Sequence, residues 1–444
     1  MSYTIIGSGP TGLTLAYILA LNNYNVTIIE QDNQLGGSWN SQWIDDMYFS
    51  ENSPRIYLET KNSKLLFTHL GLKDSDFKNI YGNLFTTNYK FVSFLFKYFN
   101  FFDYFLFLYS FIKYRIVTRN ITIQEWINET PLSDNAKKAI KIISILICDI
   151  PEKTNVNDFF NSITALGIPK QMREPNKWHT LIEEYLTKKS NVKIYKNSKV
   201  IKLLKNNNNF SVYVKNDLYN YNFVINSVKV FLCTQSNGIY PILKNSDLDI
   251  QNNWMPIEKM KKWSENTFYS GFGFQLHFDR EVMFKDEWCW SCSSDWTVII
   301  LPVSNWLKKI SKDKRIKTVW SCCIVDLNTL SKRINKTANQ CNLQEVLQEC
   351  LYQIKQNYNI PDPTRLTYSN GLVKINNKWV SKNTGYTKGT YNDIPLKGEI
   401  DNLYALGSFT KSLNDQISTM NASIDSVAEY LNTYERLDIN LFNQ

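Results

Sequence analysis

Three glycines and one carboxylate near the start of the chain have a spacing that suits nucleotide binding. Gly7, Gly9 and Gly12 stand in "GSGPTG", between the apolar stretch "YTIIG" and the helical pattern "LTLAYILALNN". In a strand–turn–helix unit the first glycine allows the tight turn, the second lets the backbone approach a pyrophosphate, and the third lets helix and strand pack closely. The helix N-terminus offers free N–H groups and a partial positive charge to the phosphates. The pattern predicts a dinucleotide site, and its contacts at this turn are expected from Gly7, Gly9, Pro10, Thr11 and Gly12.

An acidic residue ends the second apolar stretch, "YNVTIIE". Glu30, with Gln31 beside it, follows Gly12 by about one helix and one strand. A carboxylate at this position accepts hydrogen bonds from the adenosine ribose and repels a 2′-phosphate. The residue therefore favours FAD or NAD over NADP.

A second glycine pair follows in "QLGGSW". In this motif the chain resembles the flavoprotein superfamily of the monoamine oxidases and the phytoene-type desaturases, whose second glycine pair lies against the pyrophosphate. The resemblance implies FAD as the cofactor. It assigns contacts with FAD to Gly36, Gly37, Ser38 and Trp39, although many members have arginine where this chain has Ser38.

Three later segments extend the resemblance. In "FSENSPRIY" the resemblance places Ser53, Pro54 and Arg55 beside the flavin, with a surface or interdomain salt bridge as the alternative for Arg55. It assigns a backbone contact with the adenine to Val200, whose alternative is an ordinary core valine. "EIDNLYALGSFTKSLNDQISTMNASIDSVAEYLN" resembles the C-terminal flavin segment, in which a helix N-terminus faces the flavin. This segment lacks cysteine, so the FAD is expected to be non-covalent, with contacts from Gly407, Ser408, Thr419 and Met420.

The catalytic residues are not assigned by sequence. The lysine that monoamine oxidases carry in a substrate-domain strand is missing from "YSGFGFQLHFDREV", where the position falls at Gly273 or Phe274. In this strand Phe272, Phe274, Leu276 and Phe278 alternate with polar residues, which predicts an apolar face and an opposite face. Gln275 and His277 are weak catalytic candidates on that opposite face, and the alternative is that they face solvent. The spacing of the histidines predicts no metal site.

The elements predict an α/β protein. A Rossmann-like FAD-binding domain, a parallel sheet with a βαβ start, is expected from residues 1–90, 190–245 and 395–434. An inserted α+β substrate domain takes a helical part at 91–189 and a sheet part at 246–394, and 435–444 form a tail. Within the helical part, Ser133 or Asp134 is expected to cap a helix.

Composition narrows the partners. The 444 residues carry a net charge of +9 that is spread along the chain, so no nucleic-acid partner is expected. The early first strand and the eight unpatterned cysteines favour a reduced, cytoplasmic setting. The aromatic segment 91–114 is interrupted by charges, and it reads either as core helices or as a patch that contacts a membrane peripherally. The oligomeric state is not indicated.

The function expected from these features is an FAD-dependent oxidase or dehydrogenase. A small-molecule substrate, apolar or bulky, would give a hydride to flavin N5, and oxygen is the expected electron acceptor. Three alternatives share the fold: a redox-neutral isomerase or mutase, a flavin monooxygenase, and a non-catalytic FAD-fold scaffold. "GGSW" resembles the monooxygenase motif, but the middle of the chain has no second glycine-rich turn for NADPH.

Overall fold

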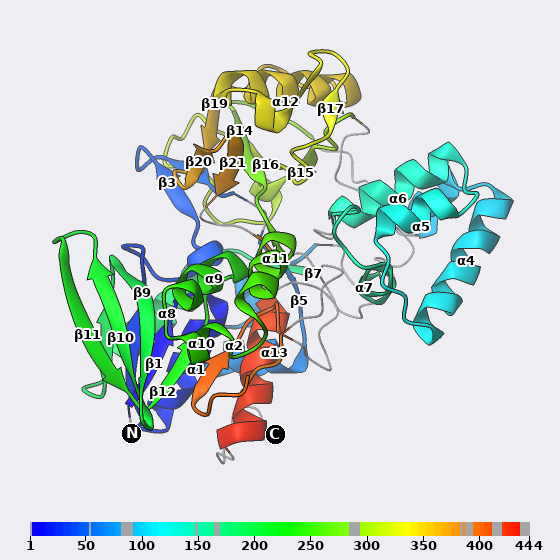
Figure 1. Ribbon diagram of the computed structural model, residues 1–444. Helices are drawn as coiled ribbons and strands as arrows, with labels where there is room; N and C mark the ends of the chain where they lie inside the picture. The colour runs from blue at the N-terminus through cyan, green and yellow to red at the C-terminus, as the bar shows by residue number, and fades with distance from the viewer. Residues whose placement is uncertain are drawn as a thin grey trace.

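The computed structural model describes residues 2–52, 55–80, 92–146, 150–163, 169–283, 294–381, 385–386, 394–410 and 420–435. Figure 1 shows three parts: a nucleotide-binding part with the blue and red ends of the chain, a sheet part in yellow and brown at the top, and a helical part in cyan at the right. This is the predicted Rossmann-like domain with an inserted α+β domain, and the predicted boundaries between the domains stay predictions.

A five-stranded parallel sheet forms the centre of the nucleotide-binding part. Its strand order is β23-β12-β1-β2-β8, so segments from both ends and the middle of the chain lie side by side. The first helix, α1 (Pro10–Leu21), connects β1 to β2 and completes the expected βαβ unit. The strands are β1 (Ser2–Ile6), β2 (Asn25–Ile29), β8 (Val192–Tyr195), β12 (Lys229–Leu232) and β23 (Leu403–Ala405).

Both faces of this sheet are buried, which explains the continuous apolar runs in its strands. Tyr3 and Ile5 pack into the cluster formed with α1 and three further helices, whereas Ile6 packs into the cluster on the other face. The first face is covered by α2 (Lys61–His69), α8 (Lys177–Thr187) and α13 (Met420–Tyr430). The second face is covered by β9 (Ser198–Asn206), β10 (Asn209–Asn216), β11 (Tyr221–Ser227), α9 (Ser236–Lys244), α10 (Leu248–Gln251) and α11 (Ile257–Thr267).

The sheet part is built on four antiparallel strands in the order β15-β16-β14-β19. Its central strand β14 carries the predicted alternation, and its phenylalanines pack into a core shared with the amphipathic helix α12. A hairpin from the N-terminal segment contacts β14 and β19, so this core joins the nucleotide-binding part. The elements are β14 (Phe272–Phe278), β15 (Ile299–Leu301), β16 (Thr318–Ile324), β19 (Arg365–Tyr368), α12 (Leu343–Asn357) and the hairpin of β3 (Gln42–Ile44) and β4 (Tyr48–Ser50).

The helical part has its own core. Trp126 and Phe160 stack with other aromatic rings at its centre. Asp103 is buried, and it accepts hydrogen bonds from the Ser133 N–H and hydroxyl at 2.9 and 2.6 Å. Ser133 also caps the helix that begins at Asp134, as predicted, so it links that helix to the one that carries Asp103. The helices are α4 (Phe101–Ile116), α5 (Ile123–Glu129), α6 (Asp134–Leu146) and α7 (Val156–Ser162).

The remaining strands form short antiparallel pairs and a three-stranded sheet. The three-stranded sheet has the order β5-β7-β6, and it joins strands from before and after the helical part of the chain. Its strands are β5 (Ile56–Leu58), β6 (Phe77–Asn79) and β7 (Pro169–Met172). The pairs are β13 (Phe268–Tyr269) with β22 (Gly385–Tyr386), β17 (Leu330–Ser331) with β18 (Lys336–Thr337), and β20 (Leu372–Ile375) with β21 (Lys378–Ser381).

The contact between Asn52 and β14 gives a test of the junction between the two parts. A Cβ on Gly273 would lie 2.0 Å from the backbone oxygen of Asn52, whereas a Cβ on Gly271 would lie 3.2 Å from its nearest neighbour. We expect Gly273→Ala to lower the free energy of unfolding by about 3 kcal/mol, because rigid backbone must move. Gly271→Ala is the matched control with a much smaller cost. Denaturant unfolding measures both, and equal costs would contradict a close junction.

Candidate functional site

The turn between β1 and α1 has the geometry that the three glycines predict. Gly7 has a positive φ of 98°, which an L side chain rarely adopts. A Cβ on Gly12 would lie 1.9 Å from the Gly7 carbonyl oxygen, so only glycine lets the helix approach the turn. A Cβ on Gly9 would meet no protein atom within 4 Å. The second glycine therefore borders open space, as a backbone that approaches a ligand must.

The N-terminus of α1 is free to face that space. Gly9 occupies the N-cap position and gives no side-chain cap, and Pro10 opens the helix, where its missing N–H costs nothing. Thr11 and Gly12 follow in the first turn, and both are buried. The uncapped backbone N–H groups and the helix dipole fit a bound pyrophosphate.

Glu30 lies against this turn at the end of β2. Its side chain accepts hydrogen bonds from the Ser8 N–H at 2.8 Å, the Ser8 hydroxyl at 2.6 Å and the Asp32 N–H at 2.9 Å. Burial raises the pKa of Glu30, and the three hydrogen bonds oppose that rise. The carboxylate is thus held within the glycine turn, while Gln31 next to it is exposed.

The second glycine pair sits directly on the first turn. Gly36 and Gly37 have φ of 107° and 53°, and the Gly36 N–H donates to the Ser8 carbonyl oxygen at 2.9 Å. A Cβ on Gly37 would lie 2.9 Å from the Gly9 Cα. Two loops that the sequence separates by a whole βα unit therefore meet at one point. Ser38 and Trp39 continue in a short 3-10 helix, half-buried beside this point.

The other predicted cofactor residues divide into three groups. Gly407 follows β23, next to β12 and β1, so it lies at the same carboxyl edge of the sheet as Gly7; Ser408 comes next in the chain. Val200 lies in β9 and is buried, and Met420 begins α13, which packs on α1. The predicted contacts that lie outside the described residues are Ser53, Pro54 and Thr419.

Arg55 is buried in an ion pair rather than exposed. Its Nη2 donates to the Asn40 carbonyl oxygen at 3.0 Å, and its Nε lies 3.9 Å from Oε2 of Glu51. Among the described residues, neither oxygen of the Glu51 carboxylate has a hydrogen-bond partner of normal geometry. Burial raises the pKa of Glu51 to about 7, against the lowering effects of Arg55 and of the nearby Ser321 hydroxyl. Sequence reasoning missed Glu51, although it lies in the segment already assigned to the flavin.

His179 is a second residue that the sequence did not single out for the cofactor. It lies in α8 with its ring against Gly36. A Cβ added to Gly36 would lie 2.9 to 3.1 Å from three atoms of the His179 ring. The side chain is buried, and within the described part of the chain neither ring nitrogen has a hydrogen-bond partner. Burial, with the charge of Arg55, lowers the pKa of His179 to about 4, so the ring is neutral at pH 7.

Gln275 and His277 do not face solvent. Both are fully buried, because the segment from Phe49 to Asn52 covers this face of β14. The Gln275 amide donates to the Glu51 carbonyl oxygen at 2.6 Å, and its oxygen accepts from the Thr367 hydroxyl at 3.1 Å. His277 Nε2 lies 3.0 Å from the same hydroxyl. These contacts tie the sheet part to the Glu51 segment, and a catalytic role for either residue stays a prediction.

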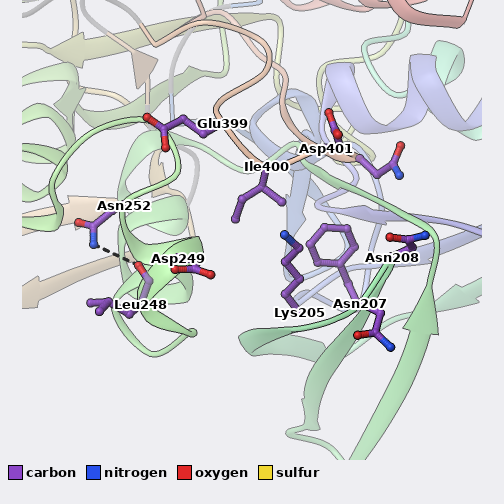
Figure 2. A pocket seen from close by; sticks show the side chains of 11 residues that line it. Lys205, Asn207, Asn208, Leu248, Asp249, Asn252, Glu399, Ile400 and Asp401 are labelled. Carbon is purple, nitrogen blue, oxygen red and sulfur yellow. Dashed lines mark hydrogen bonds between the residues drawn. The ribbon is translucent and has the colours of Figure 1, made fainter.

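A hollow on the surface lies elsewhere. Figure 2 shows it between the β9–β10 hairpin, α10 and residues 399–402. Asn402, in its lining, precedes β23, and its carbonyl oxygen accepts from the N–H of Val230 near the start of β12. The hollow is therefore at the amino edge of the parallel sheet, opposite the carboxyl edge where nucleotides bind in such folds. It is lined by none of the predicted cofactor residues.

Comparison with known proteins supports the fold. Residues 5–70 match the family model of the NAD(P)-binding Rossmann-like domain. No protein of curated function has a significantly similar sequence. Putrescine oxidase bound to putrescine superposes with a TM-score of 0.66 at 12% identity, over 97% of this chain and 99% of that chain. The chain has the fold of this oxidase along its whole length.

Two further structures agree. Cyclohexylamine oxidase from Brevibacterium oxydans superposes with a TM-score of 0.60 at 10% identity, over 96% of each chain. An oxidoreductase from Methanosarcina mazei superposes with a TM-score of 0.62 at 13% identity, over 98% of this chain and 100% of that chain. The amine oxidase fold that the sequence motifs predicted is thus confirmed.

Alanine substitutions at Gly9 and Gly12 distinguish an effect on cofactor binding from an effect on stability. We expect Gly9→Ala to keep the melting temperature of the protein, because its Cβ meets no protein atom, and to weaken FAD binding by at least about tenfold, because a methyl group then blocks the pyrophosphate. We expect Gly12→Ala to lose stability as well, because its Cβ overlaps the Gly7 oxygen. Thermal melting and FAD titration measure both effects. Unchanged FAD binding in Gly9→Ala would contradict the site.

The raised pKa of Glu51 predicts a pH-dependent stability. Its folded-state pKa of about 7 exceeds the ordinary value of 4.5, so the folded protein holds this proton more tightly than the unfolded chain. The stability contributed is complete below pH 4.5 and is lost as the pH rises through about 7. Relative to Glu51→Gln, the wild type should therefore lose melting temperature between pH 5 and 7.

The control for this experiment is Glu184→Gln, on the exposed face of α8. It should follow the wild-type pH dependence. His179 and His277, whose pKa values burial lowers to about 4, destabilise the fold as the pH falls below 6.5. They are present in all three proteins, so their effect cancels in the differences. Parallel curves for wild type and Glu51→Gln would refute the raised pKa.

Proposed function

We propose that the chain is an FAD-dependent oxidoreductase that oxidises a small-molecule substrate. The observation that carries the proposal is the meeting of the two glycine loops beside Glu30, with open space at Gly9. The amine oxidase fold supports the choice of FAD, as does the resemblance of the motifs to flavoproteins. An acidic residue at this strand end also favours FAD over a cofactor with a 2′-phosphate.

Different residues would hold different parts of the FAD. Gly9 leaves room for the pyrophosphate, Gly37 lets its loop pack on the Gly9 backbone, and the first turn of α1 would supply N–H donors to the phosphates. Glu30 would hold the adenosine ribose, and Val200 would contact the adenine through its backbone. Gly407 and the start of α13 would hold the flavin end. We propose that the FAD is bound non-covalently, because residues 399–432 contain no cysteine.

His179 belongs to the same set. A buried imidazole without partners for either nitrogen is costly unless a ligand supplies them. Its ring lies against Gly36, whose loop covers the pyrophosphate turn. We propose that His179 would donate a hydrogen bond, as a neutral imidazole, to the bound FAD.

Glu51 would accept the proton that the reaction releases. When bound, FAD supplies the chemistry of accepting a hydride from the substrate and passing the electrons to an acceptor, for which we propose oxygen. Oxidation of a C–H next to an amine or alcohol also releases a proton. A buried carboxyl with a pKa of about 7 is matched to accept it near neutral pH. Arg55 at 3.9 Å offsets the negative charge of the ionised form.

The proposed substrate class rests on a missing lysine and on the aromatic content of the substrate domain. The lysine of the monoamine oxidases is missing, and β14 has Gly273 and Phe274 near that position. The substrate domain is rich in aromatic residues. The missing lysine argues against an amine oxidase reaction, and the aromatic-rich substrate domain favours an apolar or bulky substrate.

The visible spectrum of the purified protein tests this function. We expect a flavin absorption band that denaturation shifts to that of free FAD, because the cofactor is tightly but not covalently bound. Apo-protein prepared by denaturant should recover the band with added FAD, and Gly9→Ala should not. A wild-type protein that is folded, colourless and unable to bind FAD would overturn the proposal. If FAD binds, compounds that bleach the band anaerobically identify the substrate class.

A further inference from the structure

The outer face of α4 is apolar and exposed, although a helix of a globular protein usually buries such a face. Its exposed fractions run from 52% at Ile112 to 90% at Phe101. At 100° per residue the exposed side chains fall within one third of the helix circumference. We call this stripe the α4 face, and it consists of Phe101, Phe102, Phe105, Leu108, Tyr109, Ile112 and Ile116.

The opposite side of α4 fixes the helix in place. Trp126 Nε1 donates to the Ser110 hydroxyl at 3.1 Å, and the ring of Tyr114 stacks on Phe160. Asp103 accepts hydrogen bonds from Ser133, the residue that precedes α6. The helix therefore cannot turn its apolar stripe inward without breaking a buried core. In Figure 1, α4 forms the outer edge of the helical part.

The exposed charged side chains on α4 and in the segment before it are all positive. Between residues 92 and 118 the charged side chains are Lys97, Lys113, Arg115 and the buried Asp103. By helix geometry, Lys113 and Arg115 lie on the two edges of the stripe. Lys113 Nζ lies 5.9 Å from the Tyr109 ring centre, and the Arg115 guanidinium lies 5.2 Å from that of Phe111. An aromatic and aliphatic stripe with cations on both edges is the composition of helices that lie in a membrane interface.

We propose that the α4 face docks on the surface of an anionic lipid bilayer, with α4 parallel to the membrane plane. Its aromatic and aliphatic side chains would enter the boundary between headgroups and acyl chains, and the edge cations would contact lipid phosphates. Among the described helices, none has the length and hydropathy needed to cross a membrane.

A second copy of the chain fits the α4 face less well. Lys113 and Arg115 both lie in the last turn of α4, so a twofold dimer with parallel α4 helices would bring the cations of the two copies together. Such like-charge contacts oppose association, whereas an anionic bilayer neutralises them. The charge pattern thus favours the lipid surface. This inference does not depend on the flavin proposal, and its test uses no measurement of FAD.

Vesicle co-sedimentation of the full chain tests the docking. The vesicles are phosphatidylcholine alone, or an equal mixture of phosphatidylcholine and phosphatidylserine. We expect binding to the mixed vesicles, and a loss of more than about tenfold in the partition coefficient for Phe105→Ser combined with Ile112→Ser. Lys113→Gln and Arg115→Gln should each weaken it by about fivefold, and only on the mixed vesicles.

The control replaces apolar side chains of similar exposure far from α4. Leu248 and Tyr219 are both 71% exposed, and their replacement by serine should leave binding unchanged. Melting temperatures show that every variant is folded, as expected for exposed positions. Equal binding by the α4 variants and the wild type would overturn the proposal. A wild-type protein that binds neither kind of vesicle would overturn it as well. Light scattering that shows a dimer, converted to a monomer by the α4 variants, would assign the face to a second copy and also overturn it.

Discussion

The approach of α1 to the turn after β1 is the constraint on which the rest of the structure depends. A single methyl group at Gly12 would lie 1.9 Å from the Gly7 oxygen, so helix and turn are in direct backbone contact. This contact points the free end of α1 along the carboxyl edge of the sheet. The loop of Gly37 packs on this turn so closely that a Cβ on Gly37 would lie 2.9 Å from the Gly9 Cα. The nucleotide site is thus a product of backbone packing, and side chains only refine it.

The second organising contact joins the two domains. Asn52 presses against Gly273 and accepts its N–H at 3.2 Å, and Gln275 donates to the carbonyl oxygen of Glu51. These bonds hold the segment with Glu51 and Arg55 between a rigid sheet and the glycine loops. Burial, the cause of the raised Glu51 pKa, is therefore a consequence of how the domains meet. The acid–base property and the domain junction are one structural feature.

The sequence predicted what depends on neighbours along the chain. The βαβ unit, the position of Glu30 beside the glycine turn and the cap at Ser133 are local patterns, and the structure has all three, whereas the ribose contact of Glu30 stays a prediction. Burial of Gln275 and His277 was not predictable, because alternation marks two faces of a strand and does not show that a segment more than 200 residues away covers the second. In α4 nearly every position is apolar, so the pattern cannot tell the packed side from the exposed one. His179 had no motif, and only its position beside Gly36 makes it a candidate.

The order of strands in the central sheet also affects how the protein is made. Tyr3 pairs with Lys229, and Val230 pairs with Leu403, so the sheet is completed only when the last tenth of the chain is available. The helices between residues 92 and 163 depend on contacts close in sequence and can form while synthesis continues. During synthesis the helical part can therefore fold before the central sheet, which carries the glycine loops, is complete.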